Sequence, residues 1–451
     1  MSPEFLGLIL LGALLTGIFV GFPIAFTLII LAVVFGFIGF GNKVFYLMVY
    51  QTVGLMKEET LAAVPLFVFM GHMMEEAGLM ERLFKSFQSI LGGLKGSLFI
   101  GVLLTATVFA TATGIIGASV TVMGLLAAPA MMKSKYDVAM SAGVITAGGC
   151  LGILIPPSVL LVVLGPVVGV SVVTLFIAAM IPGLILSGLF LAYTIIRCQL
   201  NPELGPPLPR EERLTSPKAI LLEFISGIVP LAVVIFAALG SIIAGLATPT
   251  EAAAMASVGA ILLTILYRRM TMERMKAAVL KALATSSMVL FLAVASNVYG
   301  SVFARLGTAS LITDTMLALP ISPMAMIVVL MAVIFLLGWP LEWPAIVFIF
   351  VPIFLPVIQE LDLMVAGYRV GSSMGLVWFC TLVAVNLQTA FLSPPVAMAA
   401  YYLKGVAPDW PLGKIYKGMM QFMILQCIGL AIVLFFPEVA LWLPKLFVGG
   451  R

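Results

Sequence analysis

The sequence predicts an all-α polytopic membrane protein made of two inverted repeats, with two re-entrant hairpins and two broken helices. Hydrophobic residues make up 63% of the 451 residues and charged residues only 9%, with a mean hydropathy of +1.23. A soluble chain carries roughly 25% charged residues. Uncharged runs long enough to cross a hydrocarbon core of about 30 Å recur along the chain, and two of them contain a Pro-Pro pair.

Charged residues divide the chain into candidate membrane spans. The apolar run at the N-terminus is too long for a signal peptide and has no basic segment before it, so we interpret it as two spans. Residues 41–60 carry several charges and are expected near the membrane interface. The predicted spans are residues 5–22, 24–40, 61–80, 138–165, 172–196, 219–246, 252–267, 282–304, 371–403 and 418–437.

A Pro-rich hydrophilic stretch from about Asn201 to Pro217 separates two halves of similar size. Each half is expected to run span, hairpin, broken helix and span, and this shared order indicates an internal repeat. The predicted units are N-terminal scaffold helices at 1–60, repeat 1 at 61–200, a cytoplasmic linker with scaffold helices at 201–281, repeat 2 at 282–437 and a C-terminal tail at 438–451.

Two uncharged segments are too long for one helix at about 1.5 Å per residue, and each breaks in its middle. Residues 97–132 have a Gly-rich centre at 113–119, and residues 321–359 hold one charge, Glu342. Basic residues flank the first segment and acidic residues flank the second, which places their ends on opposite sides of the membrane. We interpret them as an inward-opening and an outward-opening re-entrant hairpin. The alternative is a pair of ordinary spans joined by a tight turn.

The Pro-Pro pairs predict that the uncharged runs 138–165 and 371–403 are interrupted helices. Two adjacent prolines remove two backbone donors and bar the preceding residue from helical geometry. In a bilayer such a break survives only where protein buries it or where it lines a cavity. Matching breaks in two halves are typical of the substrate site of a secondary transporter.

The oxygen atoms at the hairpin tips and breaks suit a monovalent hard cation better than a transition metal. Freed carbonyls can bind Na⁺, and the N-terminus of a half-helix favours an anion. The predicted Na⁺-binding residues are Thr113, Gly114, Gly117, Ser119, Gly149, Gly152, Pro156, Gly338, Glu342, Thr389, Ser393 and Pro394. The predicted substrate-binding residues are Ser119, Pro157, Ser158, Asn386 and Pro395. Glycine and serine in membrane helices also serve close packing, which is the structural alternative.

Glu342 is a mid-membrane acid, which costs about 2.5–3.5 kcal/mol on insertion scales and is functional by default. It could ligate Na⁺, cap backbone N–H groups at the tip, or carry a proton. The alternative is a residue exposed in a short periplasmic loop.

Other function classes find no support in the sequence. The chain has no His-Glu-x-x-His motif and no Walker A motif, so we expect neither an enzyme nor an ATP-driven pump. The four cysteines show no metal spacing or disulfide framework. We expect no cofactor besides Na⁺ as coupling ion, and no nucleic-acid partner, because the net charge of +4 mostly reflects basic loops.

Several motifs resemble the large membrane subunit of tripartite ATP-independent periplasmic (TRAP) transporters, and the match covers nearly the whole chain. In the first half they are Gly-x-x-Gly-Ala-Ser at 114–119, Ala128-Pro-Ala-Met-Met132, Tyr136-Asp137 and the specific Gly-Gly-Cys-Leu-Gly-Ile-Leu-Ile-Pro-Pro-Ser at 148–158. In the second half they are the residues from Leu337 to Glu342, Pro352-x-x-Leu-Pro356, Asn386-Leu-Gln and Leu392-Ser-Pro-Pro-Val396.

The resemblance implies an elevator-type, Na⁺-coupled importer of an organic anion in the bacterial inner membrane. Na⁺ is then expected where each hairpin tip meets its broken helix, with the anion between the tips. The resemblance also implies a small four-helix membrane subunit and a soluble periplasmic binding protein as partners. The family commonly carries Asp where this chain has Glu342. The competing hypothesis is a self-sufficient Na⁺/anion symporter or ion antiporter of the same elevator superfamily.

Overall fold

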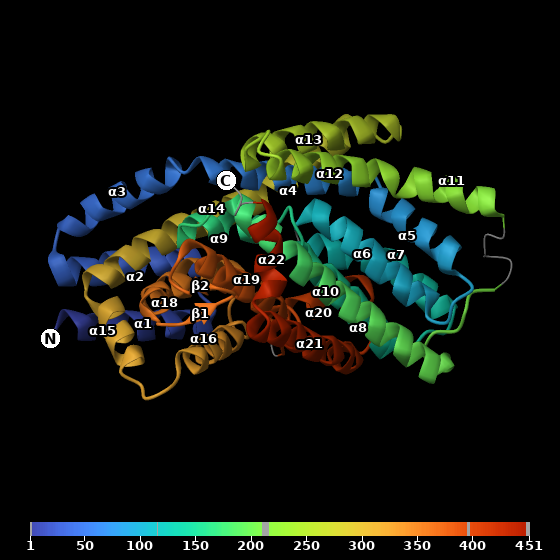
Figure 1. Ribbon diagram of the computed structural model, residues 1–451. Coiled ribbons are helices and arrows are strands. Elements are labelled where there is room, and N and C mark those ends of the chain that lie inside the picture. The colour runs from blue at the N-terminus through green and yellow to red at the C-terminus, as the bar shows by residue number, and fades with distance from the viewer. Residues whose placement is uncertain (1, 115, 210–215, 395–396, 448–451) are drawn as a thin grey trace.

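The computed structural model describes residues 2–114, 116–209, 216–394 and 397–447, and nearly all of them lie in helices. Eight of the described helices are long and apolar enough to cross a membrane, and a bent pair, Lys218–Gly227 with Val229–Ile243, makes a ninth. The long helices run roughly along the long dimension of the molecule (Figure 1). The chain is therefore a multi-pass membrane protein, as composition predicted.

The first half begins with helices that lie along one edge of the molecule and continues with a helix pair and an interrupted helix. Its helices are α1 (Pro3–Val20), α2 (Ile24–Phe40), α3 (Lys43–Met56), the 3-10 turn η1 (Glu59–Ala62), α4 (Ala63–Glu76), α5 (Leu79–Leu91), α6 (Ser97–Thr113), α7 (Ile116–Lys133), α8 (Val138–Cys150), η2 (Leu151–Ile153), α9 (Val159–Val168), α10 (Val172–Leu200) and η3 (Pro202–Leu204).

The second half repeats this order of elements. It consists of α11 (Pro217–Gly227), α12 (Val229–Ile243), α13 (Pro249–Leu266), α14 (Met272–Arg305), α15 (Thr308–Leu317), α16 (Pro323–Leu337), α17 (Trp343–Ala345), the π-helical turn η5 (Ile346–Phe350), α18 (Val351–Glu360), β1 (Met364–Val365), β2 (Tyr368–Arg369), α19 (Ser373–Ala390), α20 (Met398–Val406), α21 (Leu412–Phe435) and α22 (Glu438–Phe447).

The two halves share their packing partners as well as their order of elements. Helix α2 packs on α14 as α13 packs on α4, and α10 packs on α19 as α21 packs on α8. Helix α1 contacts α15, the short helix of the other half, as α11 contacts α5. The correspondence thus takes in α1, α2, α11 and α13, which the sequence had placed outside the repeats.

Side-chain caps explain why several helices begin where they do. Asp137 precedes α8 and accepts a hydrogen bond from Met140 N–H at 2.7 Å. Thr248 and Glu251 form a reciprocal capping box at the start of α13. Such caps satisfy backbone donors that the first turn of a helix leaves unpaired.

Five features differ from the sequence-based expectations or add to them. Residues 43–56 form a helix, and α14 begins ten residues before the predicted span at 282. Residues 364–369 form a two-stranded β-hairpin, so the fold is not purely helical. The expected C-terminal tail contains α22, which packs on α10. The second arm of the predicted hairpin 321–359 contains a π-helical turn because Pro352 lacks the N–H that an α-helix needs there.

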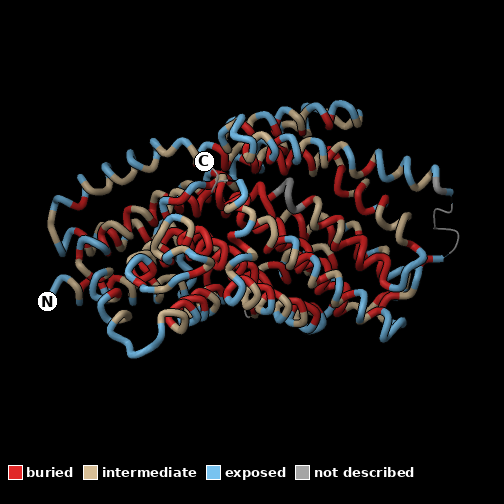
Figure 2. Tube along the Cα trace, in the orientation of Figure 1, coloured by how far each residue is buried: buried red, intermediate tan, exposed pale blue. Residues whose placement is uncertain are grey.

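Buried residues concentrate where α8, α10, α19 and α21 pack, whereas α3, α11 and α13 have long exposed faces (Figure 2). Small residues permit this close packing. A Cβ atom added at Gly418 in α21 would overlap the backbone carbonyl of Ala139 in α8 and lie 2.9 Å from Gly143 N. The two helices therefore meet through their backbones.

We expect Gly418→Ala to destabilise the protein by roughly 1–3 kcal/mol, the usual cost of overpacking a close-packed interior. The matched control is Gly413→Ala on the same helix, where an added Cβ meets nothing within 4 Å. Thermal unfolding of both variants in detergent checks this. Equal stability of the two variants would contradict the backbone contact between α8 and α21.

Candidate functional site

The first helix pair, α6 and α7, turns at Gly114, and its inner end rests on the first interrupted helix. Gly114 is buried with a positive φ of +59°, a backbone conformation that favours glycine. A Cβ at this position would lie 3.2 Å from the Val159 side chain and 3.4 Å from Val159 N. The turn between α6 and α7 therefore lies against the start of α9.

The first interruption separates α8 from α9 through residues 151–158, all of them buried. Pro156 and Pro157 cannot donate to the carbonyls of Gly152 and Ile153, four residues earlier. Ser158 caps α9, because its Oγ accepts from Leu161 N–H at 3.4 Å and donates to the Ile153 carbonyl. The interruption thus places the Gly152 carbonyl, which lacks its helical donor, and the N-terminus of α9 close together in the interior.

The second helix pair, α16 and the helical arm from Trp343 to Glu360, turns at residues 338–342. A Cβ at Gly338 would lie 2.9 Å from the Cβ of Ala390, the last residue of α19. Only glycine allows this approach. The turn of the second pair therefore lies against the second interrupted helix, as the turn of the first pair lies against the first.

A chain of hydrogen bonds runs along the second interruption, between α19 and α20. The Ser393 hydroxyl donates to Thr389 O at 2.7 Å, and the Thr389 hydroxyl donates to Asn386 O at 2.7 Å. The Asn386 amide donates to Met331 O in α16 at 2.7 Å, while its Oδ1 is buried with no partner among the described residues. These groups join α19 to the second helix pair and leave one acceptor available.

The inner ends of both helix pairs and both interruptions meet around a central cavity of about 100 Å³. Residues of α4 and α14 complete its wall. The lining residues are Val68, Gly114, Ile116, Gly117, Ile153, Val159, Thr285, Met288, Val289, Glu342, Trp343, Phe391, Met398 and Tyr402. The two helix pairs lie in opposite halves of the molecule in Figure 1, so they reach this point from opposite ends.

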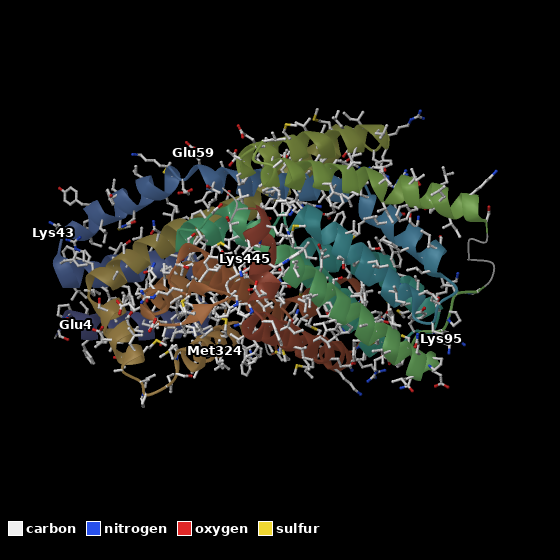
Figure 3. The ribbon with its side chains drawn as sticks, in the orientation of Figure 1. Glu4, Lys43, Glu59, Lys95, Met324 and Lys445 are labelled. Atoms are coloured by element: carbon white, nitrogen blue, oxygen red, sulfur yellow. The ribbon has the colours of Figure 1, made fainter. Side chains whose placement is uncertain are left out.

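Glu342 is half-buried and lines this cavity together with a neighbouring one of about 270 Å³ that reaches α1 and α2. No Lys, Arg or His side chain forms an ion pair with Glu342 in the part of the chain that the structure describes. Of the charged residues labelled in Figure 3, Glu4 and Lys43 lie toward one end of the long dimension and Lys95 toward the other, whereas Glu59 and Lys445 lie nearer the middle. Among the residues that line the central cavity, Glu342 is the one that carries a formal charge.

In the structure, some of the predicted site residues line the cavity and others do not. Gly114, Gly117 and Glu342 line the central cavity, and Gly338 lines the neighbouring one. Gly117 and Ser119 lie inside α7 instead of in the turn, because the turn is shorter than the predicted 113–119. The side chain of Thr113 and all of Pro395 lie outside the described residues.

The remaining predicted residues lie in the interruptions or next to them, outside the cavity wall. Gly149 in α8 packs against α7, since a Cβ at this position would lie 3.2 Å from Val120 N. Gly152, Pro156, Pro157 and Ser158 belong to the first interruption. Thr389 lies in the last turn of α19, and Ser393 and Pro394 belong to the second interruption. Asn386 faces Met331 instead of the cavity. Their roles in binding remain predictions.

Aromatic residues that the sequence did not single out form much of the cavity wall. Tyr402 in α20 covers the first helix pair, because a Cβ at Gly117 would lie 3.1 Å from its Cζ. Trp343 begins the outer arm of the second pair, and Phe391 follows α19. The only sequence signal that could have indicated these aromatic residues is that they lie near Glu342 or near the second Pro-Pro motif in the chain.

Residues 11–439 match the family model of the DctM component of tripartite ATP-independent periplasmic transporters. The chain is 29% identical over 435 residues to the sialic acid TRAP transporter large permease protein SiaM of Vibrio cholerae, covering 96% of this chain and 97% of that protein. It is 30% identical over 389 residues to the C4-dicarboxylate TRAP transporter large permease protein DctM of Pseudomonas aeruginosa, covering 86% of each.

A third relative is the 2,3-diketo-L-gulonate TRAP transporter large permease protein YiaN of Escherichia coli, at 28% identity over 436 residues and with 96% of this chain and 97% of that protein covered. Among solved structures, the Alcanivorax borkumensis YdaH transporter superposes with a TM-score of 0.62 over 96% of this chain and 98% of that chain. At 13% identity, this likeness shows a shared fold.

Proposed function

This chain belongs to the DctM-component family of tripartite ATP-independent periplasmic transporters, and we propose that it is the large permease subunit of a Na⁺-coupled importer of a small organic anion. Two of its relatives are TRAP transporter large permease proteins, and each match covers 96% of this chain and 97% of the relative. The observation that carries the proposal is the meeting of two helix-pair turns with two interrupted helices around one cavity.

The two helix pairs act as re-entrant hairpins in this proposal, α6/α7 opening to the cytoplasm and the pair from α16 to α18 opening to the periplasm. Their turns end at the central cavity, and within a bilayer backbone without helical hydrogen bonds is tolerated only where protein buries it or where it lines a cavity. Hairpins and interrupted helices form the moving part. Helices α1–α4 and α11–α14, whose partners recur between the halves, form the fixed scaffold of an elevator.

Na⁺ binds where each hairpin turn touches its interrupted helix. At the first contact, the carbonyls of Gly152 and Ile153 lack the backbone donors that an α-helix would provide, because Pro156 and Pro157 have no N–H group. At the second, Thr389, Ser393 and the residues around Gly338 supply oxygen atoms, and Glu342 supplies a negative charge nearby. Carbonyl, hydroxyl and carboxylate oxygens are the donors that hard cations prefer.

The substrate binds in the central cavity between the hairpin turns. The N-terminus of α9, capped by Ser158, directs backbone N–H groups and the positive end of a helix dipole toward this region. We assign the chain to the bacterial inner membrane, together with a small four-helix membrane subunit and a soluble periplasmic binding protein that delivers the anion.

Uptake into proteoliposomes tests the requirement for these partners. We expect substrate uptake under a Na⁺ gradient only when the large subunit, the small subunit and the binding protein are all present. Omitting the binding protein should reduce uptake to the level of protein-free vesicles. Full uptake by the large subunit alone would instead support a self-sufficient symporter of the same elevator superfamily.

A further inference from the structure

We propose that two neighbouring cavities beside Glu58 bind a primary ammonium group carried on an apolar chain, and that this ligand holds α9 and the second hairpin against the scaffold. The binding site stands apart from the proposed function, but its effect on transport rests on it, because that effect needs a moving part. Two observations carry the inference: a carboxylate without a cationic partner, and an apolar cavity that adjoins it.

The larger cavity, of about 300 Å³, contains the polar groups of the pair. Gln51 lies in the second half of α3, Glu58 follows that helix, and Asn297 belongs to α14. The Asn297 amide donates to the Gln51 backbone carbonyl at 3.3 Å, so α3 and α14 are joined at the cavity wall. The side chains of these three residues offer a carboxylate and two amide oxygens as acceptors, and a primary ammonium group brings three donors.

Glu58 is the charged residue that both cavities share. It is half-buried, and no Lys, Arg or His side chain forms an ion pair with it in the part of the chain that the structure describes. The next residue, Glu59, is exposed at the outer edge of the molecule (Figure 3) and lines neither cavity. A carboxylate that is partly shielded from water attracts a cation more strongly than an exposed one does.

The smaller cavity, of about 280 Å³, is apolar apart from Glu58. It shares Leu55, Glu58 and Leu61 with the larger cavity, and the rest of its wall consists of Met56, Ala62, Leu290 and Val294. One charge therefore lies between a polar and an apolar space. A small inorganic cation or a short amine fills only the first of them, whereas an ammonium group with an apolar chain fills both.

The far wall of the larger cavity belongs to other elements. Val163 and Val167 come from α9, Phe348 from η5 and Pro352 from α18. In the proposed function α3 and α14 are scaffold, and α9, η5 and α18 move. A ligand that fills the cavity contacts both sides, so it must leave before they slide past each other. An amine bound there therefore inhibits transport.

Titration of the purified full-length chain with decylamine tests the binding site. The chain is placed in nanodiscs of phosphatidylcholine, which has no primary amine, at pH 7, where an alkylamine is protonated like a lysine side chain. Decanoate has the same chain with the opposite charge, and ethylamine has the same head group without the chain. We expect decylamine to stabilise the protein against thermal unfolding at concentrations roughly 10-fold or more below those of either control. Equal stabilisation by decanoate and decylamine would overturn the proposal.

Substitutions then locate the site. Glu58→Gln keeps the shape of the side chain and should weaken decylamine binding on the order of 10-fold, whereas Glu59→Gln should leave it unchanged. Leu290→Trp fills the apolar cavity and should also weaken binding, and its matched control is Leu283→Trp at an exposed position of the same helix. Unchanged decylamine binding in Glu58→Gln would mean that the amine only partitions into the bilayer, and the proposal would fail.

A lipid head group and a free amine share this chemistry, and adding phosphatidylethanolamine to the nanodiscs separates them. If the lipid occupies the site, the wild type should need more decylamine for the same stabilisation, while Glu58→Gln should show no such shift. If the shift is absent in both, the occupant is a free amine, and the effect of Glu58→Gln on decylamine binding decides the proposal.

Uptake in the presence of decylamine distinguishes this inference from the proposed function. In vesicles with all three components, we expect inhibition of the wild type and roughly 10-fold more decylamine for the same inhibition of Glu58→Gln. If binding depends on Glu58 but uptake is not inhibited, the ligand does not hold the two sides together, although the binding site stands. If no vesicle takes up substrate, the proposed function fails, whereas the binding titration still decides the site.

Discussion

Replacing Pro156 and Pro157 with alanine is expected to reduce Na⁺-dependent uptake to background while the protein still inserts into the membrane. Two alanines restore the backbone donors for the Gly152 and Ile153 carbonyls and remove the steric bar to helix, so α8 can continue toward α9. The carbonyl ligands of the first Na⁺ site and the free N-terminus of α9 would then disappear together. Apolar length is unchanged, so insertion should not suffer.

The control for this experiment is Pro182→Ala. Pro182 is buried inside α10, which runs without interruption from Val172 to Leu200. Its replacement also removes a buried proline but leaves no interruption to repair, and uptake should be retained. Uptake by the Pro156/Pro157 double variant with normal Na⁺ affinity would mean that these prolines only shape a packed helix. Pro394 and Pro395 allow the same comparison for the second site.

The interruptions could be predicted from the sequence because local covalent chemistry determines them. A Pro-Pro pair prevents a continuous helix whatever surrounds it, and the structure interrupts both runs at those pairs, between α8 and α9 and between α19 and α20. The turns at Gly114 and Gly338 were also predictable, because each lies near the middle of an uncharged or nearly uncharged segment that is too long for one helix. Membership of the DctM family followed from the same motifs.

The cavity wall could not be predicted, because its helices are apolar on every side. A helix with a polar and an apolar face reveals from its sequence which side is buried, but helices such as α8 and α16 show no such pattern. Tertiary packing alone decides that Tyr402 covers Gly117 and that Asn386 turns to Met331. For the same reason Ser119 could be assigned to the turn, although it lies in the first turns of α7.

Uptake is also expected to depend strongly on membrane potential. One Na⁺ ion at each of the two proposed sites and one monovalent organic anion move one net positive charge inward per cycle, and each unit charge gains about 2.3 kcal/mol per 100 mV. At equilibrium this corresponds to roughly 50-fold more accumulation at 100 mV, inside negative, than at zero potential. Flux measurements in vesicles clamped with K⁺ and valinomycin check this. Uptake that is indifferent to the imposed potential would exclude a net charge of +1 per cycle.

The most direct test of Na⁺ coupling is uptake of a labelled organic anion by vesicles that contain all three components, with Na⁺ outside in one sample and K⁺ in the other. Every proposed ligand set, from the Gly152 carbonyl to Glu342, is assembled for Na⁺, so uptake should be concentrative in Na⁺ and absent in K⁺. Equal rates and equal accumulation with the two cations would show that transport is not coupled to Na⁺.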